Sequence, residues 1–382
     1  MQLISIPGSM RSLSEIIRDQ ITIGGPLSFH DFMEMALYYP GLGYYTSEPD
    51  KIGKQGDYYT IPYFTDLYGK LVAKQLEEMW LLLDKNDFTI VEYGAGMGSL
   101  CSDILGELKK NPAFYKKLKY CIIEKSKPMR QKELRALHHS HTSFEKVYWH
   151  DAIEEMPPFT GCILANEVVD NFAVHKVVMG EKGLMEVFVD YNDGFTEILE
   201  PAQEHLKNYF TQLKVELPVG FCTEINLEAL DWIKNISGSL QKGFVLTMDY
   251  GFPSSELYQS NRRLGTIVCY NKHTVNDLPY NNIGQQDITA HVNFSALDLW
   301  GRKNGLLNCG FTNQSQFLLS LGLTEQLRKI EEAEKNNYKI KEKLLFLHTL
   351  LMSMGKKIKV LIQQKGLNRP ELSGLKFSQP LV

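Results

Sequence analysis

The sequence has no paired cysteines and no cluster with metal-ligand spacing. Its six cysteines are scattered, and no two of them form a Cys-x-x-Cys pair; they stand at positions 101, 121, 162, 222, 269 and 309. Several lie in apolar runs such as Tyr120–Ile123, where cysteine acts as a small buried hydrophobic residue. We therefore expect no metal site, and the cysteine usage fits a reducing compartment.

Long apolar runs and an excess of basic charge are missing as well. No stretch approaches the length needed to cross a bilayer, and residues 1–7 are too short and uncharged for a signal peptide. The 41 Lys and Arg residues are outnumbered by 45 Asp and Glu residues, whereas a nucleic-acid-binding domain is usually basic. We expect a cytosolic protein with no membrane insertion and no nucleic-acid partner, although a trimmed mitochondrial form has the same appearance.

Residues 1–84 predict a helical N-terminal extension. Ser12-x-x-Glu15 and Ser28-x-x-Asp31 have the form of capping boxes at helix starts. Residues 65–83 carry apolar side chains at helical spacing, which predicts a third helix.

Residues 85–366 alternate short apolar strands with helical stretches, which is typical of a parallel α/β sheet. A hairpin over 175–191 and an irregular stretch after the fifth strand predict insertions at about 172–215 and 252–290, and residues 367–382 are expected to be a loosely held tail. The pattern predicts a Rossmann-like sheet of seven strands, as in class I methyltransferases. The first five strands are expected at 89–93, 120–124, 146–150, 161–165 and 244–249.

A glycine-rich turn follows the first of these strands. Glu92 ends the strand, and Gly94, Gly96 and Gly98 lead into a helix. Glycines at alternate positions allow a tight turn and the close approach of a ligand. No Lys-Ser/Thr follows, so a phosphate-binding P-loop is excluded, and Glu92 suits the ammonium group of S-adenosylmethionine better than a pyrophosphate. The alternative is a structural turn between strand and helix.

Acidic residues also follow the next two strands. Glu124 stands where this kind of fold binds ribose hydroxyls, and Asp151 can accept from the adenine amino group while the N–H of Ala152 serves a ring nitrogen. The alternatives are a solvated charge for Glu124 and a helix cap for Asp151. Because the carboxyl ends of parallel strands meet at one crevice, the three signals together predict a cofactor site for S-adenosylmethionine.

The candidate acceptor site follows the fourth strand. Asn166 is expected to hold the methionine end of the cofactor, and Glu167 and Asp170 provide the paired carboxylates that suit a guanidinium group. The alternative is that Asp170 caps a helix or faces solvent. His291 is a candidate base, although a lone histidine is more often structural.

Over most of its length the chain resembles the MidA-like methyltransferase family, which includes the arginine methyltransferase that assists assembly of mitochondrial complex I. The resemblance is carried by stretches at 24–29, 33–45, 92–98, 166–170, 249–251 and 287–294, and by Gly56-Asp57-Tyr58-Tyr59-Thr60. It implies that Gly56 and Asp57 belong to the cofactor site. Departures from the family pattern at residues 60–63 and 170–173 bear on the acceptor rather than on the cofactor.

The resemblance implies methylation of arginine in a protein partner, with subunits of a respiratory complex as the family precedent. Two alternatives remain open: a small-molecule O- or N-methyltransferase, and a non-catalytic assembly factor that keeps the fold. An arginine enzyme needs an open acidic groove, whereas a small-molecule enzyme needs an enclosed, mostly apolar pocket.

Overall fold

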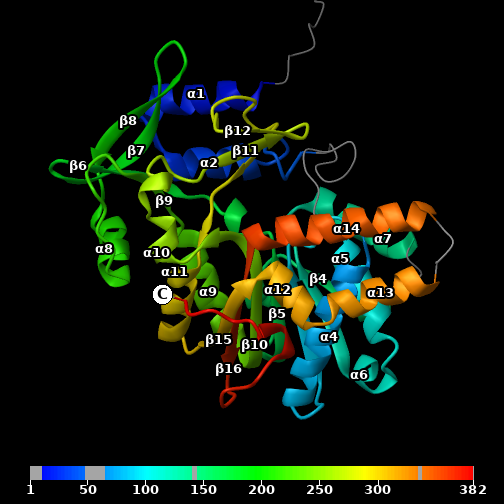
Figure 1. Cartoon of the computed structure of the whole chain (residues 1–382). Coiled ribbons are helices and arrows are strands. Elements are labelled where there is room, and N and C mark those ends of the chain that lie inside the picture. Colours follow the sequence, from blue (N-terminus) through cyan, green and yellow to red (C-terminus); the bar gives the residue numbers. More distant parts are fainter. Residues whose placement is uncertain (1–10, 48–64, 140–143, 334–337, 382) are drawn as a thin grey trace, which may run out of the picture.

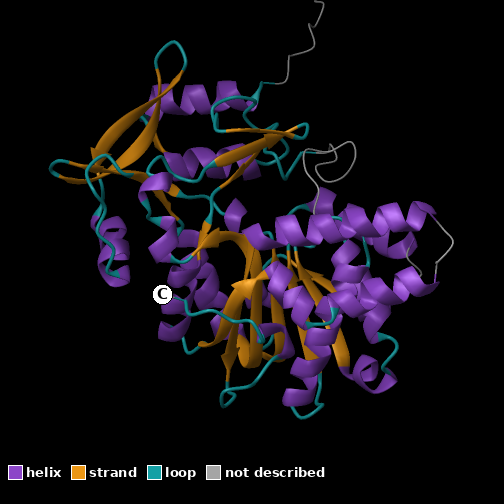
Figure 2. Cartoon of the chain, viewed as in Figure 1, coloured by secondary structure: helices purple, strands orange, loops and turns teal. Residues whose placement is uncertain are grey.

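The computed structural model describes residues 11–47, 65–139, 144–333 and 338–381 (Figure 1). A large sheet runs through the centre of the chain, and helices cover both of its faces (Figure 2). This arrangement confirms the α/β class that the strand and helix pattern predicts.

Within the described ranges the central sheet has eight strands, seven of which follow the order β15-β16-β10-β5-β2-β3-β4. All neighbours from β10 to β4 pair in parallel, while β16 is antiparallel to both β10 and β15. The eighth strand, β14 (Val292–Asn293), extends the sheet beside the end of β10. The seven are β2 (Phe88–Tyr93), β3 (Leu118–Ile123), β4 (Val147–His150), β5 (Phe159–Asn166), β10 (Leu240–Phe252), β15 (Leu307–Asn313) and β16 (Ile358–Lys365).

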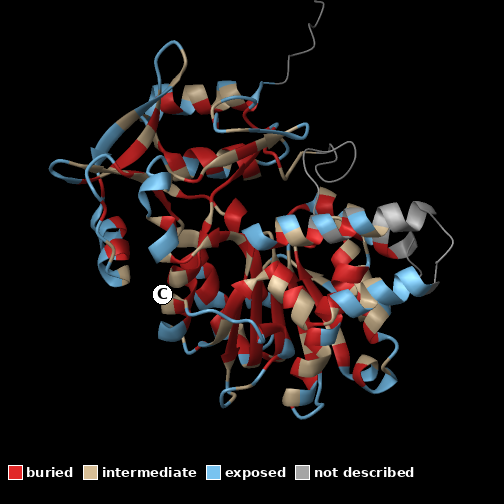
Figure 3. Cartoon of the chain, in the orientation of Figure 1, coloured by how far each residue is buried: buried red, intermediate tan, exposed pale blue. Residues whose placement is uncertain are grey.

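The strands are apolar on both faces because each face lies under helices. Along β2, Ile90 packs in the cluster on one face and its neighbour Val91 packs in the cluster on the other. The buried residues accordingly concentrate in the strands and in the inner sides of the helices (Figure 3). One face is covered by α4 (Leu67–Leu82), α5 (Ser99–Leu108), α6 (Pro112–Lys117), α7 (Lys127–His139), α12 (Gln314–Ser320), α13 (Leu323–Ala333) and α14 (Tyr338–Lys357), and the other by α9 (Leu227–Ser239) and α11 (Phe294–Lys303).

A second layer, which we call the upper lobe, lies beyond the carboxyl ends of the central strands (Figure 1). It contains α1 (Leu13–Gly24), α2 (Phe29–Tyr38) and two small sheets, with α8 (Glu204–Leu213) and α10 (Ser254–Leu257) nearby. The predicted hairpin is present as β6 and β7. The strands are β1 (Leu27–Ser28), β6 (His175–Gly180), β7 (Gly183–Tyr191), β8 (Phe195–Pro201) and β9 (Cys222–Ile225) in one sheet, and β11 (Val268–Asn271), β12 (Thr274–Asn276) and β13 (Asp287–Thr289) in the other.

The structure differs from the sequence expectations at both ends of the chain. The helices expected in residues 1–84 do not form one structural unit. Helices α1 and α2 pack against the inserted sheets, while α4 packs on the central sheet. Residues 367–381 are not a loose tail, because the N–H of Gln379 donates to the carbonyl of Phe311 at 2.7 Å and Leu375 is buried. The N–H of Ser373 also donates to the Glu78 carboxylate, at 2.9 Å.

Candidate active site

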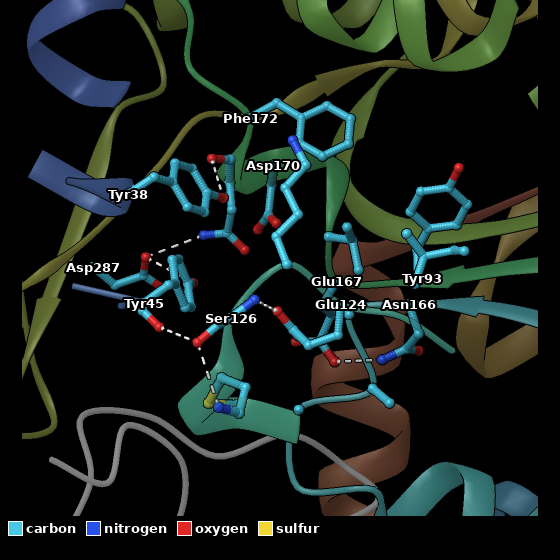
Figure 4. A pocket seen from close by; sticks show the side chains of 18 of the residues that line it. Tyr38, Tyr45, Tyr93, Glu124, Ser126, Asn166, Glu167, Asp170, Phe172 and Asp287 are labelled. Carbon is cyan, nitrogen blue, oxygen red and sulfur yellow. Dashed lines mark hydrogen bonds between the residues drawn. The ribbon is translucent and has the colours of Figure 1, made fainter. Parts of the chain in front are cut away.

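A cavity of about 1360 Å³ lies between the carboxyl ends of the central strands and the upper lobe. Most of the residues that the sequence singles out line it, and Figure 4 shows several of them converging on this space. Those that line the cavity are Glu92, Gly94, Gly96, Glu124, Asp151, Ala152, Asn166, Glu167 and Asp170. The cavity is therefore formed by the loops after β2, β3, β4 and β5, together with residues of α2, α9 and β13.

The glycine turn between β2 and α5 needs its glycines for conformational reasons. Gly94, Gly96 and Gly98 have φ angles of 58°, 59° and 71°, in the left-handed region that side chains with a Cβ rarely adopt. A Cβ on Gly94 would lie 3.1 Å from a methyl group of Val168, so this position is also sterically restricted. At Gly94 and Gly96 the turn has no side chain to fill the cavity that these residues line.

Glu92 lies at the end of β2 and is 2% exposed. The Tyr120 hydroxyl donates to its carboxylate at 2.7 Å. Burial raises the pKa of Glu92 to about 7, and the Tyr120 hydrogen bond opposes this rise. A carboxylate held in this way would be stabilised by a cationic ligand in the cavity.

Glu124 follows β3 and also reaches the cavity. Its carboxylate accepts the N–H of Ser126 at 2.7 Å, and burial raises its pKa to about 7. The Ser126 hydroxyl donates to the carbonyl of Tyr45 at 2.9 Å, which joins the loop after β3 to the aromatic turn that follows α2 (Figure 4). The hydrogen bond to Tyr45 thus attaches the loop that carries Glu124 to the upper lobe.

Asp151 follows β4 and is the most exposed of the candidate acids. Its side chain is 70% exposed and forms an ion pair with Arg130. Its backbone N–H donates to the Glu155 carboxylate at 3.1 Å, so this N–H is already used. Ala152 lines the cavity beside it.

Asn166 and Glu167 lie where β5 ends. Glu167 has a φ of 54° and its N–H donates to the carbonyl of Met248 at 2.8 Å, which turns the chain sharply away from the sheet. The amide Nδ2 of Asn166 donates to Glu167 Oε1 at 3.3 Å (Figure 4). Burial, with Asp249 nearby, raises the pKa of Glu167 to about 8.

Asp170 is 5% exposed, and its Oδ1 has no hydrogen-bond partner among the described residues. Burial and the neighbouring Asp249 raise its pKa well above the ordinary value. Asp249 keeps the negative charge more easily, because its Oδ2 accepts three backbone N–H groups, from Val168, Val169 and Asp170, at 3.1, 2.8 and 3.3 Å.

Several residues that the sequence reasoning did not assign complete the acceptor side. Asp287 of β13 is 3% exposed and accepts from Tyr45 Oη at 2.9 Å and from Asn171 Nδ2 at 3.1 Å. Glu34 and Tyr38 line the cavity from α2. Their spacing of four residues places both on one side of that helix, and this spacing is the feature of the sequence that could have identified them. The other acids that line the cavity are Glu154, Glu228 and Asp231.

His291, the candidate base, does not line the cavity. It stands just before β14, its backbone N–H donates to Thr266 Oγ1 at 3.0 Å, and its ring packs edge-on against Phe252 at 5.2 Å. Burial, together with the nearby cations Arg262, Lys357 and Lys359, lowers the pKa of His291 to about 4. The assignment of His291 to catalysis is therefore wrong. Gly98 does not line the cavity either, and Gly56 and Asp57 lie outside the described residues.

Within the described ranges, no group of three or more His, Cys, Asp or Glu side chains has the arrangement of a metal site. The same part of the chain contains no helix that is both long and apolar enough to cross a membrane.

Known proteins resemble this chain over most of its length. Residues 71–312 match the family model of an S-adenosyl-L-methionine-dependent methyltransferase. A Drosophila melanogaster relative, named protein arginine methyltransferase NDUFAF7 homolog, mitochondrial, is 26% identical over 337 residues, which cover 80% of this chain and 74% of the relative. The human protein arginine methyltransferase NDUFAF7, mitochondrial, is 23% identical over 356 residues, with 87% and 78% covered.

A solved structure extends this similarity to three dimensions. The crystal structure of a Burkholderia thailandensis protein bound to S-adenosyl-homocysteine superposes with a TM-score of 0.86. Its sequence is 28% identical, and the match covers 96% of this chain and 95% of that protein. The predicted class I methyltransferase fold is thereby confirmed.

The relatives correct the expected location. We expected a cytosolic protein, but the Drosophila and human relatives are named as mitochondrial proteins, which points to a mitochondrial location instead. The cytosolic expectation was wrong because it rested on an absence of recognised targeting features, and such an absence does not exclude a mitochondrial location.

The glycine turn, the acids that follow three neighbouring strands and the family match agree on one cofactor, S-adenosylmethionine. The chain therefore belongs to the family of S-adenosyl-L-methionine-dependent methyltransferases.

Proposed function

We propose that this protein transfers a methyl group from S-adenosylmethionine to a guanidinium nitrogen of an arginine in a protein partner. The observation that carries the proposal is the buried carboxyl group of Asp170, which lines the cavity with one oxygen lacking a partner, close to Glu167. Buried carboxyl oxygens are rarely left without a hydrogen bond, so a ligand with several N–H donors suits this position.

The cofactor would be held by residues at the ends of β2, β3, β4 and β5. Glu92 suits the ammonium group, Glu124 suits the ribose hydroxyls, and Asp151 and Ala152 border the space for the adenine ring. The glycine turn and Asn166 border the methionine end. The cofactor supplies an electrophilic methyl group on a sulfonium centre.

The chain's own residues then position the acceptor. Glu167 and Asp170 present two carboxyl groups to one guanidinium group, which is planar and carries donors in a fixed fork. Exclusion of water and alignment of the nitrogen with the methyl carbon are the main requirements of a displacement of this kind. The nitrogen would form its bond to the methyl carbon while the carbon–sulfur bond breaks and the sulfur leaves as a neutral thioether, and the carboxylate of Glu167 would take up the proton that the nitrogen releases.

The remaining support comes from charge and from relatives. The acids Glu34, Glu228 and Asp231 also line the cavity and favour a cationic substrate. The Drosophila and human relatives are both named as protein arginine methyltransferases, at 26% and 23% identity. A subunit of a respiratory complex is the partner that the family resemblance favours.

The test is methylation of arginine in such subunits, or in peptides from them, measured by mass spectrometry with labelled cofactor. Glu167→Gln keeps the shape and removes the charge, so we expect a loss of about a hundredfold in methyl transfer, the scale of general acid–base contributions. Cofactor affinity should change by less than about threefold, because glutamine keeps a side-chain oxygen that can accept from Asn166. Glu200→Gln, in the exposed strand β8, is the matched control and should keep full activity.

Full activity of both Glu167→Gln and Asp170→Asn would contradict the acidic acceptor site. Methylation of small molecules by the wild-type protein, with no arginine product, would favour the small-molecule alternative. Cofactor binding without any methyl transfer would favour a non-catalytic assembly factor.

A further inference from the structure

A buried hydrogen-bond chain reaches Asn166 from the side of the sheet opposite α9. Gln314, the first residue of α12, donates from Nε2 to the Tyr68 hydroxyl at 3.0 Å. The Tyr68 hydroxyl donates to Asn166 Oδ1 at 2.5 Å, and Asn166 Nδ2 donates to Glu167 Oε1 at 3.3 Å. Tyr68 and Gln314 are both fully buried, at 0% exposure.

The direction of this chain follows from the chemistry of its two ends. A carboxyl oxygen can accept a hydrogen bond in either protonation state, and Glu167 Oε1 accepts from Asn166 Nδ2, so the carbonyl oxygen of Asn166 faces the Tyr68 hydroxyl. Tyr68 has one proton to donate, and giving it to Asn166 leaves its oxygen free to accept from Gln314. Every donor therefore points towards the cavity.

We propose that Tyr68 is a positioning residue of the cofactor site: together with Gln314, it fixes the amide of Asn166 so that its NH₂ edge faces the cavity. The inference rests on the proposed contact between Asn166 and the methionine end of the cofactor, whose carboxylate needs a donor. Without Tyr68 the amide is free to turn about its last bond, and its oxygen would then repel that carboxylate.

The placement of Tyr68 supports a role beyond packing. It comes from α4, which belongs to neither the glycine turn nor the loop after β5, and its ring packs in the core under the central sheet. Phenylalanine would fill the same space, so the hydroxyl group is what distinguishes tyrosine here. Among the described residues, the only other acceptor of that hydroxyl is Met248 Sδ at 3.2 Å, and a thioether is a weak acceptor.

The experiment is a double-mutant cycle read by calorimetric titration with S-adenosylmethionine, which needs no acceptor. Tyr68→Phe should weaken cofactor binding about fivefold to tenfold in the wild-type background, because a charge-assisted contact loses its orientation. In the Asn166→Ala background the same substitution should have no further effect, since Tyr68 acts through Asn166. Gln314→Met should weaken binding in the same direction, by a smaller factor.

Tyr209→Phe is the matched control for lost stability. Tyr209 is also buried, and its hydroxyl accepts a hydrogen bond from Asn293 Nδ2 at 3.2 Å, away from the cavity. The Tyr209→Phe substitution should lower the melting temperature about as much as Tyr68→Phe does and should leave cofactor affinity unchanged.

The outcomes separate this inference from the proposed function. If Asn166→Ala weakens binding but Tyr68→Phe does not, or if the two effects simply add, the positioning role of Tyr68 is overturned while the role of Asn166 stands. If Asn166→Ala leaves binding unchanged, the proposed cofactor contact of Asn166 fails, and the inference fails with it. Absence of arginine methylation by the wild-type protein leaves the binding cycle fully interpretable and bears only on the proposed acceptor.

Discussion

Glu133 of α7 allows a quantitative prediction about stability and pH. It is fully buried, its Oε2 accepts the indole N–H of Trp149 at 2.7 Å, and its Oε1 has no partner in the described part of the chain. Burial, with Glu124 next in importance, raises its pKa from 4.5 to about 8. The folded state therefore binds a proton at Glu133 more tightly than the unfolded state does.

The sign of the effect follows from this difference in proton binding. The stability that Glu133 contributes is fully present below pH 4.5 and is lost as the pH rises towards about 8. At 1.36 kcal/mol per pKa unit, a shift of 3.5 units (8 − 4.5) corresponds to a loss of roughly 5 kcal/mol between these two limits. Glu133→Gln removes the titration and keeps an oxygen that can accept from Trp149.

The assay is urea unfolding of wild type and Glu133→Gln at several pH values from 4 to 9. The free energy of unfolding of the wild type minus that of the variant should fall by roughly 5 kcal/mol across this range. The variant is therefore most stable relative to the wild type at alkaline pH. Glu181→Gln, in the exposed turn between β6 and β7, is the control and should give a flat difference. A flat difference for Glu133→Gln would refute the reasoning, because it would mean that Glu133 titrates alike in both states.

Three further predictions concern the cavity. Gly96→Val should abolish binding of S-adenosylmethionine in calorimetry while leaving the circular dichroism spectrum intact, because valine cannot easily adopt a φ of 59° at the cavity wall; unchanged affinity would contradict the role of the turn. Glu124→Ala should weaken cofactor binding by about 1–3 kcal/mol, the cost of losing hydrogen bonds to a charged group, with turnover near normal at saturating cofactor; a loss of turnover with unchanged affinity would move Glu124 out of the ribose site. Binding of an arginine peptide should release protons near neutral pH, because the raised pKa of Asp170 falls when a cation arrives; equal binding heats in buffers of different ionisation enthalpy would show that no proton is released.

The cofactor side of the site was predictable from the sequence because its signals are local. A strand that ends in Glu92 and runs into three glycines specifies a turn within a few residues, and parallel strands bring their carboxyl ends to one edge whatever else the chain does. The same reasoning correctly placed Glu124, Asp151 and Asn166 beside one cavity. The positions of these residues depend on the topology of the sheet, which the alternation of strands and helices predicts well.

The acceptor side was less predictable because it depends on contacts between distant segments. Asp287 reaches the cavity from β13, and it accepts from Asn171 across 116 positions in sequence. His291 stands only four positions after Asp287, yet its side chain points away from the cavity and packs against Phe252. Sequence periodicity and motifs do not reveal which side chains of so short a segment face the cavity, because that depends on how the upper lobe docks on the sheet.

The division between the two halves of the cavity has a mechanistic consequence. The central strands supply the groups suited to the cofactor, while Glu34 and Tyr38 of α2 and Asp287 of β13 come from the upper lobe. Two hydrogen bonds of Tyr45 link these halves: its hydroxyl donates to Asp287, and its carbonyl accepts from Ser126 in the loop that carries Glu124. A shift of the upper lobe would therefore disturb the acceptor wall and the loop after β3 together. Changes in the lobe that alter acceptor choice should accordingly also affect cofactor affinity, unless the contacts of Tyr45 are preserved.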